Sequence, residues 1–247
     1  MKSILFLGSK AIGYECLRYL LTERVRLQCE VVGVLTAANN ALDHPTHNME
    51  QLCWQQQIPI YPDVDTMLGF PPVDFIISVQ YHKILRPKHI AKALQLAVNL
   101  HMAPLPELRG CNQFSFAIAQ QYRNFGTTLH RLETSVDGGA ILFERRFPIP
   151  DNCWVYDLYQ LTLKHSVELF QAHIGDILEG NYTLTPQESL HAARGTAYHH
   201  REDIESLKKI DLNWDKEKIE RHIRATFFPP FEPPYCIIEG KKFYFNA

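Results

Sequence analysis

The chain has 247 residues, of which 46% are apolar and 21% charged, and its formal net charge is −2 at pH 7. This length and apolar content allow a substantial buried core and exclude disorder of the whole chain. The near-neutral charge excludes a general basic field of the kind that binds nucleic-acid phosphates. We therefore expect a globular protein that does not bind nucleic acid. Any anionic ligand is expected to be bound by residues at its own site and not by a general positive charge.

The cysteines and the N-terminal segment predict the compartment. The six cysteines are scattered along the chain with no C-x-x-C pair, so the pattern favours neither a zinc knuckle nor a disulfide framework. The first apolar run is interrupted by Gly8 and is too short for a signal-peptide core, and no stretch reaches transmembrane length. We expect a cytoplasmic protein that does not bind a membrane.

In the first half of the chain, short apolar runs alternate with helical patterns. Strands are predicted at residues 3–7, 30–35, 73–79 and 97–101, a turn at residues 8–13 leads into a helix that runs through Leu21, and further helices are predicted at residues 49–57 and 87–94. This alternation is typical of an α/β fold with an open, mostly parallel, twisted sheet flanked by helices.

After Gly126 the pattern changes to two strand-like runs, a long helix and a short tail. The predicted runs cover residues 127–132 and 141–147, which could pair with each other or continue the sheet, and the predicted helix covers residues 156–178. Gly180 is suited to the left-handed end of that helix, so we expect a main domain at residues 1–180 and a small extension at residues 181–247. The extension is predicted to contain a helix at residues 216–224 and a hairpin at residues 235–245 that turns at Glu239 and Gly240.

The extension contains ten Lys and Arg residues and ten Asp and Glu residues, so it is not a basic arm for nucleic acid. Its tandem His199 and His200 lack a third ligand at metal-like spacing, and we expect them in a solvated loop. Its aromatic residues at positions 227, 228, 231 and 235 could stack on a base or pack the tail against the body, and the sequence leaves both interpretations open.

An Asn-x-His pair, Asn99 and His101, stands at the end of a predicted parallel strand. Side chains alternate along a strand, so both project from the same face, and ligand sites in open α/β sheets form at this edge. Taken alone, the pair is a weak signal and favours a core histidine with satisfied hydrogen bonds. The residues around it favour a functional site.

Three ordered segments resemble the folate-dependent formyltransferases. The Asn-x-His pair is followed by Leu-Pro and Arg-Gly at residues 105–106 and 109–110; residues 126–130 and 135–142 resemble the segment that carries the family's catalytic aspartate; and residues 74–78 and 82–85 resemble the strand and loop that line its folate pocket. The resemblance covers about residues 2–147 and implies that family's variant of the Rossmann fold.

The resemblance implies that Asn99, His101 and Asp137 are catalytic, and the chemistry requires such groups independently. When an amine attacks a formyl carbon, negative charge develops on oxygen and positive charge on nitrogen. Asn99 and a donating His101 can stabilise the oxyanion, and Asp137 can orient His101 or help to remove the proton. We expect Asn99→Ala, His101→Ala and Asp137→Ala each to cripple turnover.

The resemblance further implies 10-formyltetrahydrofolate as the formyl donor, with no metal or nicotinamide required. The implied folate contacts are His82, Ile84, Leu85, Leu132, Glu133 and Ser135. Residues 110–118 and 224–230 resemble the branch that formylates nucleotide-linked amino sugars, which implies a dTDP-linked 4-amino-4,6-dideoxyhexose made for surface polysaccharide. The implied substrate contacts are Lys83, Arg109, Asn112 and Gln113, although Arg109 could instead only brace its loop.

Two other functions remain open: a formyl-folate hydrolase with the same catalytic body, and a non-catalytic α/β nucleotide-binding module. The neutral tail disfavours an initiator tRNA as acceptor. Because an isolated hairpin is marginal in water, we also expect the C-terminal hairpin to pair two subunits into a homodimer.

Overall fold

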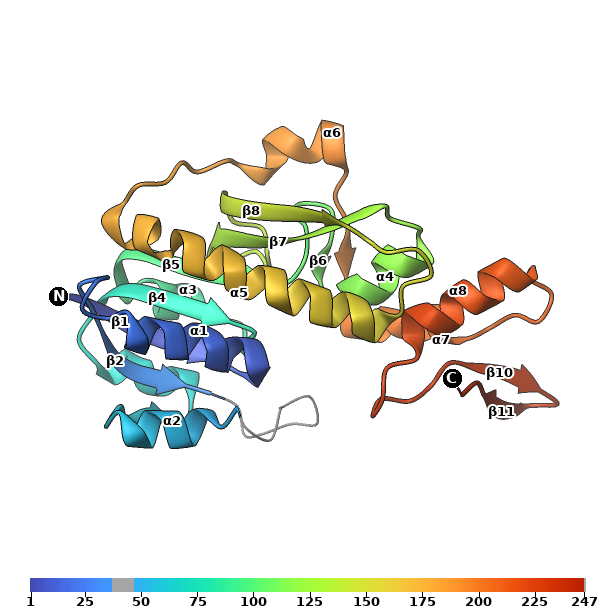
Figure 1. The fold of residues 1–247 in the computed structure, drawn as a ribbon, viewed down its shortest axis with the longest axis horizontal. Coiled ribbons are helices and arrows are strands. Elements are labelled where there is room, and N and C mark those ends of the chain that lie inside the picture. The colour runs from blue at the N-terminus through green and yellow to red at the C-terminus, as the bar shows by residue number, and fades with distance from the viewer. Residues whose placement is uncertain (37–46, 247) are drawn as a thin grey trace.

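The computed structural model describes residues 1–36 and 47–246, and its centre is a seven-stranded sheet (Figure 1). The strand order is β3-β2-β1-β4-β5-β7-β8. These strands are β1 Lys2–Gly8, β2 Cys29–Leu35, β3 Ile60–Tyr61, β4 Val73–Val79, β5 Ala93–His101, β7 Asn124–Arg131 and β8 Ile141–Pro148. The first five pair in parallel, whereas β7 is antiparallel to both β5 and β8. The predicted mostly parallel α/β fold is confirmed, and the two later strands both pair with each other and continue the sheet.

Helices pack on both faces of this sheet. They are α1 Lys10–Thr22, α2 Met49–Gln55, α3 Pro87–Ile90, α4 Gln113–Ala119 and α5 Val155–Glu179, with a 3₁₀ helix, η1, at Val64–Gly69. Alternation along β1 shows the two faces: Ile4 and Phe6 belong to the core that α1 and α5 cover, whereas Leu5 and Leu7 belong to the core that includes residues of η1. The long helix α5 crosses the first face and ends at Gly180, whose φ of 82° is the left-handed stop expected there (Figure 1).

The helix predicted at residues 87–94 is wrong in its second half. Helix α3 ends at Ile90, and Ala93 and Leu94 already belong to β5. The reason is a neighbouring strand, because Ala93 pairs with Val73 and the Val73 amide donates to the Lys92 carbonyl at 2.9 Å. Pairing with β4 therefore overrides a local pattern that suits a helix.

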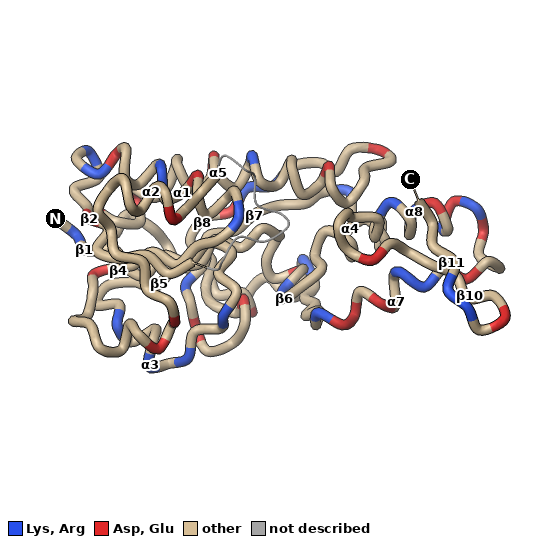
Figure 2. Tube along the Cα trace, turned by 90° about the horizontal axis from the view of Figure 1, so that it is seen from below, with Lys and Arg blue, Asp and Glu red and all other residues tan. Residues whose placement is uncertain are grey.

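The elements of the C-terminal extension are η2 Gln187–Leu190, α6 His191–Arg194, β9 Tyr198–His199, η3 Arg201–Asp203, α7 Ile204–Lys208, α8 Lys216–Thr226, β10 Tyr235–Ile238 and β11 Lys241–Tyr244. The extension first runs along the main body, where α6 lies over β8, and then places α8 and the hairpin beyond α4 (Figure 1). The hairpin β10–β11 has the predicted turn, with positive φ at Glu239 and Gly240. Basic and acidic residues are interspersed along α7, α8 and the hairpin (Figure 2).

His199 and Phe228 of the extension both pack against aromatic residues of the main body. His199 is not a solvated loop residue, because its ring stacks on Phe116 at 3.6 Å between centroids and its strand β9 pairs with β6, Arg109–Gly110. Phe228 packs against Tyr159 in the core, which is the packing alternative for that aromatic residue.

Within residues 1–36 and 47–246, no helix is long and apolar enough to span a bilayer.

Candidate active site

The end of β5 presents Asn99 and His101 beside β7. His101 is buried, with 5% of its surface exposed. Hydroxyl groups of the neighbouring strand hold the backbone here: Thr127 Oγ1 donates to the His101 carbonyl at 3.1 Å, and Thr128 Oγ1 donates to the Ala103 carbonyl at 2.9 Å. The two strands therefore fix the position of the imidazole before any ligand binds.

Asp137 reaches this edge from the loop between β7 and β8. Its Oδ2 lies 3.6 Å from His101 Nδ1 and accepts a hydrogen bond from the Gly110 amide at 3.0 Å. Its backbone φ is +50°, a left-handed conformation that Asp adopts more readily than most residues other than glycine. The structure thus brings the predicted amide, imidazole and carboxylate to one edge of the sheet.

The carboxyl group of Asp137 is held in its ionised form. Burial alone would raise its pKa, but His101, His130 and the Gly110 amide together lower the pKa well below its usual range. A buried carboxylate at neutral pH next to two imidazoles can stabilise an imidazolium or attract the proton that an attacking amine loses.

The hydrogen bonds of His101 define which of its nitrogens faces the site. Nε2 lies 2.9 Å from the Leu108 carbonyl, which can only accept, so Nε2 carries a proton and donates it there. Nδ1 is then the nitrogen that faces Asp137 and that can gain or lose a proton.

His130 is a member of this cluster that the sequence did not single out. It is 1% exposed, its Nε2 lies 3.1 Å from Asn99 Nδ2, and the same nitrogen lies 3.6 Å from Asp137 Oδ1. Asn99 and His130 are cross-strand partners in the β5–β7 pairing. Only the register between β5 and β7 places His130 beside Asn99. That register was the signal that could have identified His130, and it cannot be read from the sequence alone.

The residues predicted to contact folate lie on two loops near this edge. Leu85 is buried, and Leu132 packs against the same core cluster, whereas His82 and Ile84 are exposed. Glu133 and Ser135 lie on the loop that leads to Asp137, where Glu133 pairs with Arg131. A role of these residues in folate binding stays a prediction.

Each of the four residues predicted to bind the substrate already has a structural environment of its own. Lys83 pairs with Asp63, and Arg109 donates to the Val136 carbonyl at 2.9 Å through Nη2. Asn112 Nδ2 donates to the carbonyls of His200 and Arg201, and Gln113 is buried. Arg109 thus braces the loop of Asp137, which is one of the two roles that the sequence left open for it.

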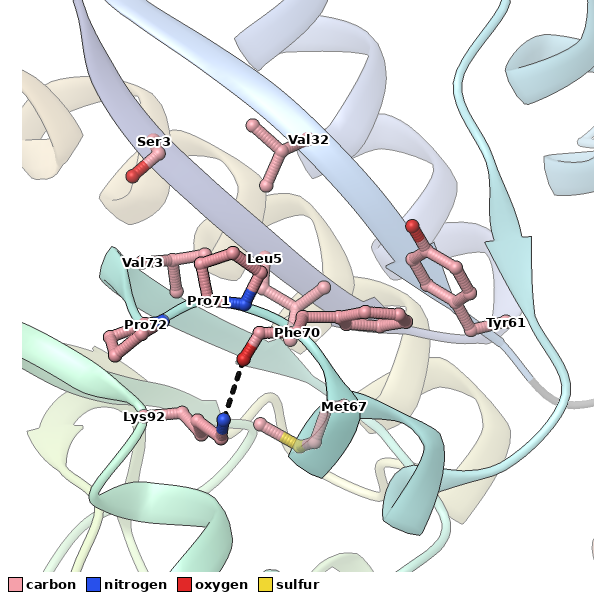
Figure 3. A pocket seen from close by; sticks show the side chains of 10 residues that line it. All are labelled: Ser3, Leu5, Val32, Tyr61, Met67, Phe70, Pro71, Pro72, Val73 and Lys92. Carbon is pink, nitrogen blue, oxygen red and sulfur yellow. Dashed lines mark hydrogen bonds between the residues drawn. The ribbon is translucent and has the colours of Figure 1, made fainter.

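A separate cavity of about 310 Å³ lies at the opposite end of the sheet (Figure 3). Ser3 and Val73 line it at the starts of their strands, Val32 lines it from the middle of β2, and Lys92 donates to the Phe70 carbonyl at 2.6 Å on one side. None of the predicted site residues lines this cavity. It is distinct from the cluster around Asp137.

Among the residues that the structure describes, no group of three or more His, Cys, Asp or Glu side chains is arranged to hold a metal ion.

The fold is an α/β sheet that carries an Asn, His and Asp cluster at the carboxyl end of a central strand. Comparison with known proteins identifies the family. The family described as Formyl transferase matches residues 25–174. The chain belongs to this family. The matched region includes the three residues of the cluster.

The curated relatives are formyltransferases. The chain is 29% identical over 176 residues to the GDP-perosamine N-formyltransferase of Brucella melitensis, covering 71% of this chain and 65% of that protein. It is 27% identical over 257 residues to the methionyl-tRNA formyltransferase of Geobacillus thermodenitrificans, covering 97% of this chain and 75% of that protein. The match thus spans just under two thirds of the length of the Brucella relative.

Solved structures share the fold. The N-formyltransferase of Helicobacter canadensis, determined with folinic acid and dTDP-3-aminofucose, superposes with a TM-score of 0.78 at 22% identity, covering 98% of this chain and 86% of that chain. A sugar N-formyltransferase from Shewanella superposes with a TM-score of 0.80 at 18% identity, covering 100% and 97% of the two chains. At these identities the likeness establishes a common architecture.

Proposed function

We propose that this protein transfers the formyl group of 10-formyltetrahydrofolate to the primary amine of a nucleotide-linked amino sugar. The observation that carries the proposal is the cluster of Asn99, His101 and Asp137 at one sheet edge, in a chain of the formyl transferase family. Sugar N-formyltransferases are among its relatives by sequence and by fold, which supports a sugar as the acceptor.

The reaction exchanges one carbon–nitrogen bond for another. The amine attacks the formyl carbon, the bond from that carbon to folate N10 breaks, the amine loses a proton and N10 gains one. In the tetrahedral intermediate, Asn99 donates its second amide proton to the oxyanion, because the first is held by His130. His101 Nδ1 takes the proton of the amine, and the ionised Asp137 stabilises the imidazolium that forms.

For the donor, we propose that the pterin lies between the loops at residues 82–85 and 132–137. Leu85 and Leu132 would contact its ring, and backbone groups of the second loop would contact its polar edge. For the acceptor, a diphosphate near Lys83 or Arg109 would share or displace the bonds that these cations make with Asp63 and Val136.

We further propose a dTDP-linked 4-amino-4,6-dideoxyhexose as the acceptor, in the synthesis of surface polysaccharide in the cytoplasm. Residues 1–180 would form the catalytic domain and residues 181–247 a small extension. The relatives differ in nucleotide, since one acts on a GDP-linked sugar and another was solved with a dTDP-linked sugar, so the nucleotide has to be tested directly.

The test is an acceptor screen. Purified protein is incubated with 10-formyltetrahydrofolate and matched dTDP-linked and GDP-linked amino sugars, and products are followed by mass for the addition of one formyl group. Addition to a dTDP-linked 4-amino sugar is the expected result. Formate release without acceptor would identify a hydrolase instead, and absence of both reactions would leave a non-catalytic α/β module.

A further inference from the structure

One side chain of the C-terminal extension reaches into the loop that carries Asp137. Gln187 is 2% exposed, and its Nε2 lies 2.7 Å from the Asp137 carbonyl and 2.7 Å from the Gly139 carbonyl. Its position is set just upstream, where Thr185 and Ile141 exchange two backbone hydrogen bonds of 2.9 Å each. The extension thus contacts the catalytic loop through side chain and backbone together.

The Gln187 amide satisfies two carbonyls without bringing a charge into the interior. Two carbonyl oxygens converge on one nitrogen, and only a group with two N–H donors at one atom satisfies both. The same arrangement turns Gln187 Oε1 into the interior, where it has no hydrogen-bond partner among the described residues. A buried acceptor without a partner lowers the stability of the folded state, so the amide holds its two donors towards the loop at the cost of one unmade hydrogen bond.

The two carbonyls flank the turn that orients the carboxylate. Asp137 has a φ of +50°, and Gly139 packs so closely that an added Cβ would lie 1.9 Å from the Arg131 carbonyl oxygen. The Gly110 amide holds the Asp137 side chain from one side, and Gln187 holds its main chain from the other. Release of the main chain would let the turn relax and carry the carboxylate away from His101.

We propose that Gln187 is a positioning residue for formyl transfer, which keeps the Asp137 carboxylate in place by clamping the backbone of its loop. The proposal rests on the proposed function. It also assigns a catalytic contribution to the extension, since Gln187 lies outside residues 25–174 that match the family.

The first test replaces the amide with an apolar side chain of similar length. For Gln187→Met we expect kcat to fall about tenfold to a hundredfold, as for a small displacement of a reacting group, with KM for folate and sugar within about twofold. Hydrogen exchange of residues 133–140 should become faster. The matched control is Glu188→Gln, at the exposed neighbouring position of the same 3₁₀ helix, which should change neither measurement.

The second test, Gln187→Glu, keeps the shape and adds a titratable group. A protonated carboxyl group can donate to one carbonyl, whereas a carboxylate faces two carbonyl oxygens and repels both. Its burial raises the pKa of the introduced group, so the ratio of variant to wild-type kcat should fall as the pH rises from 5.5 to 8. Circular dichroism at each pH checks that the variant stays folded, because ionisation of a buried carboxyl group also destabilises the fold as the pH rises.

The outcomes separate this inference from the proposed function. If the wild type transfers formyl groups while Gln187→Met keeps a wild-type kcat, or while the Gln187→Glu ratio is flat with pH, the positioning role is wrong. If the wild type transfers no formyl group, the proposed function fails, and hydrogen exchange alone decides the clamp: unchanged exchange in Gln187→Met refutes it. If Gln187→Met does not fold, the pH ratio of Gln187→Glu decides.

Discussion

At the scale of single residues, the proposed chemistry depends on His101 and Asp137 lying at 3.6 Å with the imidazole anchored on Leu108. We predict that His101→Ala and Asp137→Asn each lower kcat about a hundred- to thousandfold, in line with the loss of one preorganised group. Steady-state kinetics with formyl folate and an amino sugar measures this, and circular dichroism checks the fold. Near-normal turnover in a folded His101→Ala protein would refute the assigned role.

At the scale of elements, Asp65 in η1 forms ion pairs and hydrogen bonds with two residues of α3. It pairs with Lys88 at 2.8 Å and with the fully buried His89 at 2.9 Å. The hydrogen bond to Lys88 comes first and that to His89 second in lowering the pKa of Asp65 to about 2. Because the folded pKa lies below the ordinary value, the stabilisation is complete above about pH 4 and is lost as the pH falls towards 2.

This linkage gives a prediction for Asp65→Asn. The variant should unfold at lower urea concentration than the wild type at pH 7, and the difference should shrink as the pH falls from 4 to 2.5. Urea titrations at pH 7, 5, 3.5 and 2.5 measure it. Glu30→Gln, an exposed position on β2, is the control and should show no such trend. A difference that persists undiminished at pH 2.5 would contradict the linkage.

At the scale of the whole molecule, the hairpin β10–β11 exposes apolar side chains on both faces. The exposed fractions are 47% for Ile237, 44% for Ile238, 51% for Phe243 and 48% for Tyr244. A two-stranded hairpin is marginal in water without further burial. We therefore propose that a second copy of the chain covers it, in a homodimer.

Sedimentation tests the homodimer. The wild type should sediment with the mass of two chains, and Phe243→Lys or Ile238→Lys, on one face of the hairpin, should shift the protein towards one chain. Lys241→Ala, on the same face, should leave the dimer intact. A wild type with the mass of one chain would count against the proposal.

The sequence by itself determined the elements and the local geometry of the site. Strand β4 and the hairpin turn follow from apolar runs and from turn residues that lie close together in the chain. Asn99 and His101 share a face because side chains alternate along a strand, which is also a local property. The order of the motifs further indicated that Asp137 would join them.

Only the tertiary structure decided which groups complete the site. His130 meets Asn99 through antiparallel register, and Gln187 meets the Asp137 loop from a separate part of the chain. Helix α3 ends at Ile90 because the residues that follow it pair with β4. These contacts join positions far apart in the sequence, whereas the local hydrophobic pattern and the intrinsic propensities depend only on neighbouring residues. The physical reason is that a long-range partner is selected by the packing of the whole sheet.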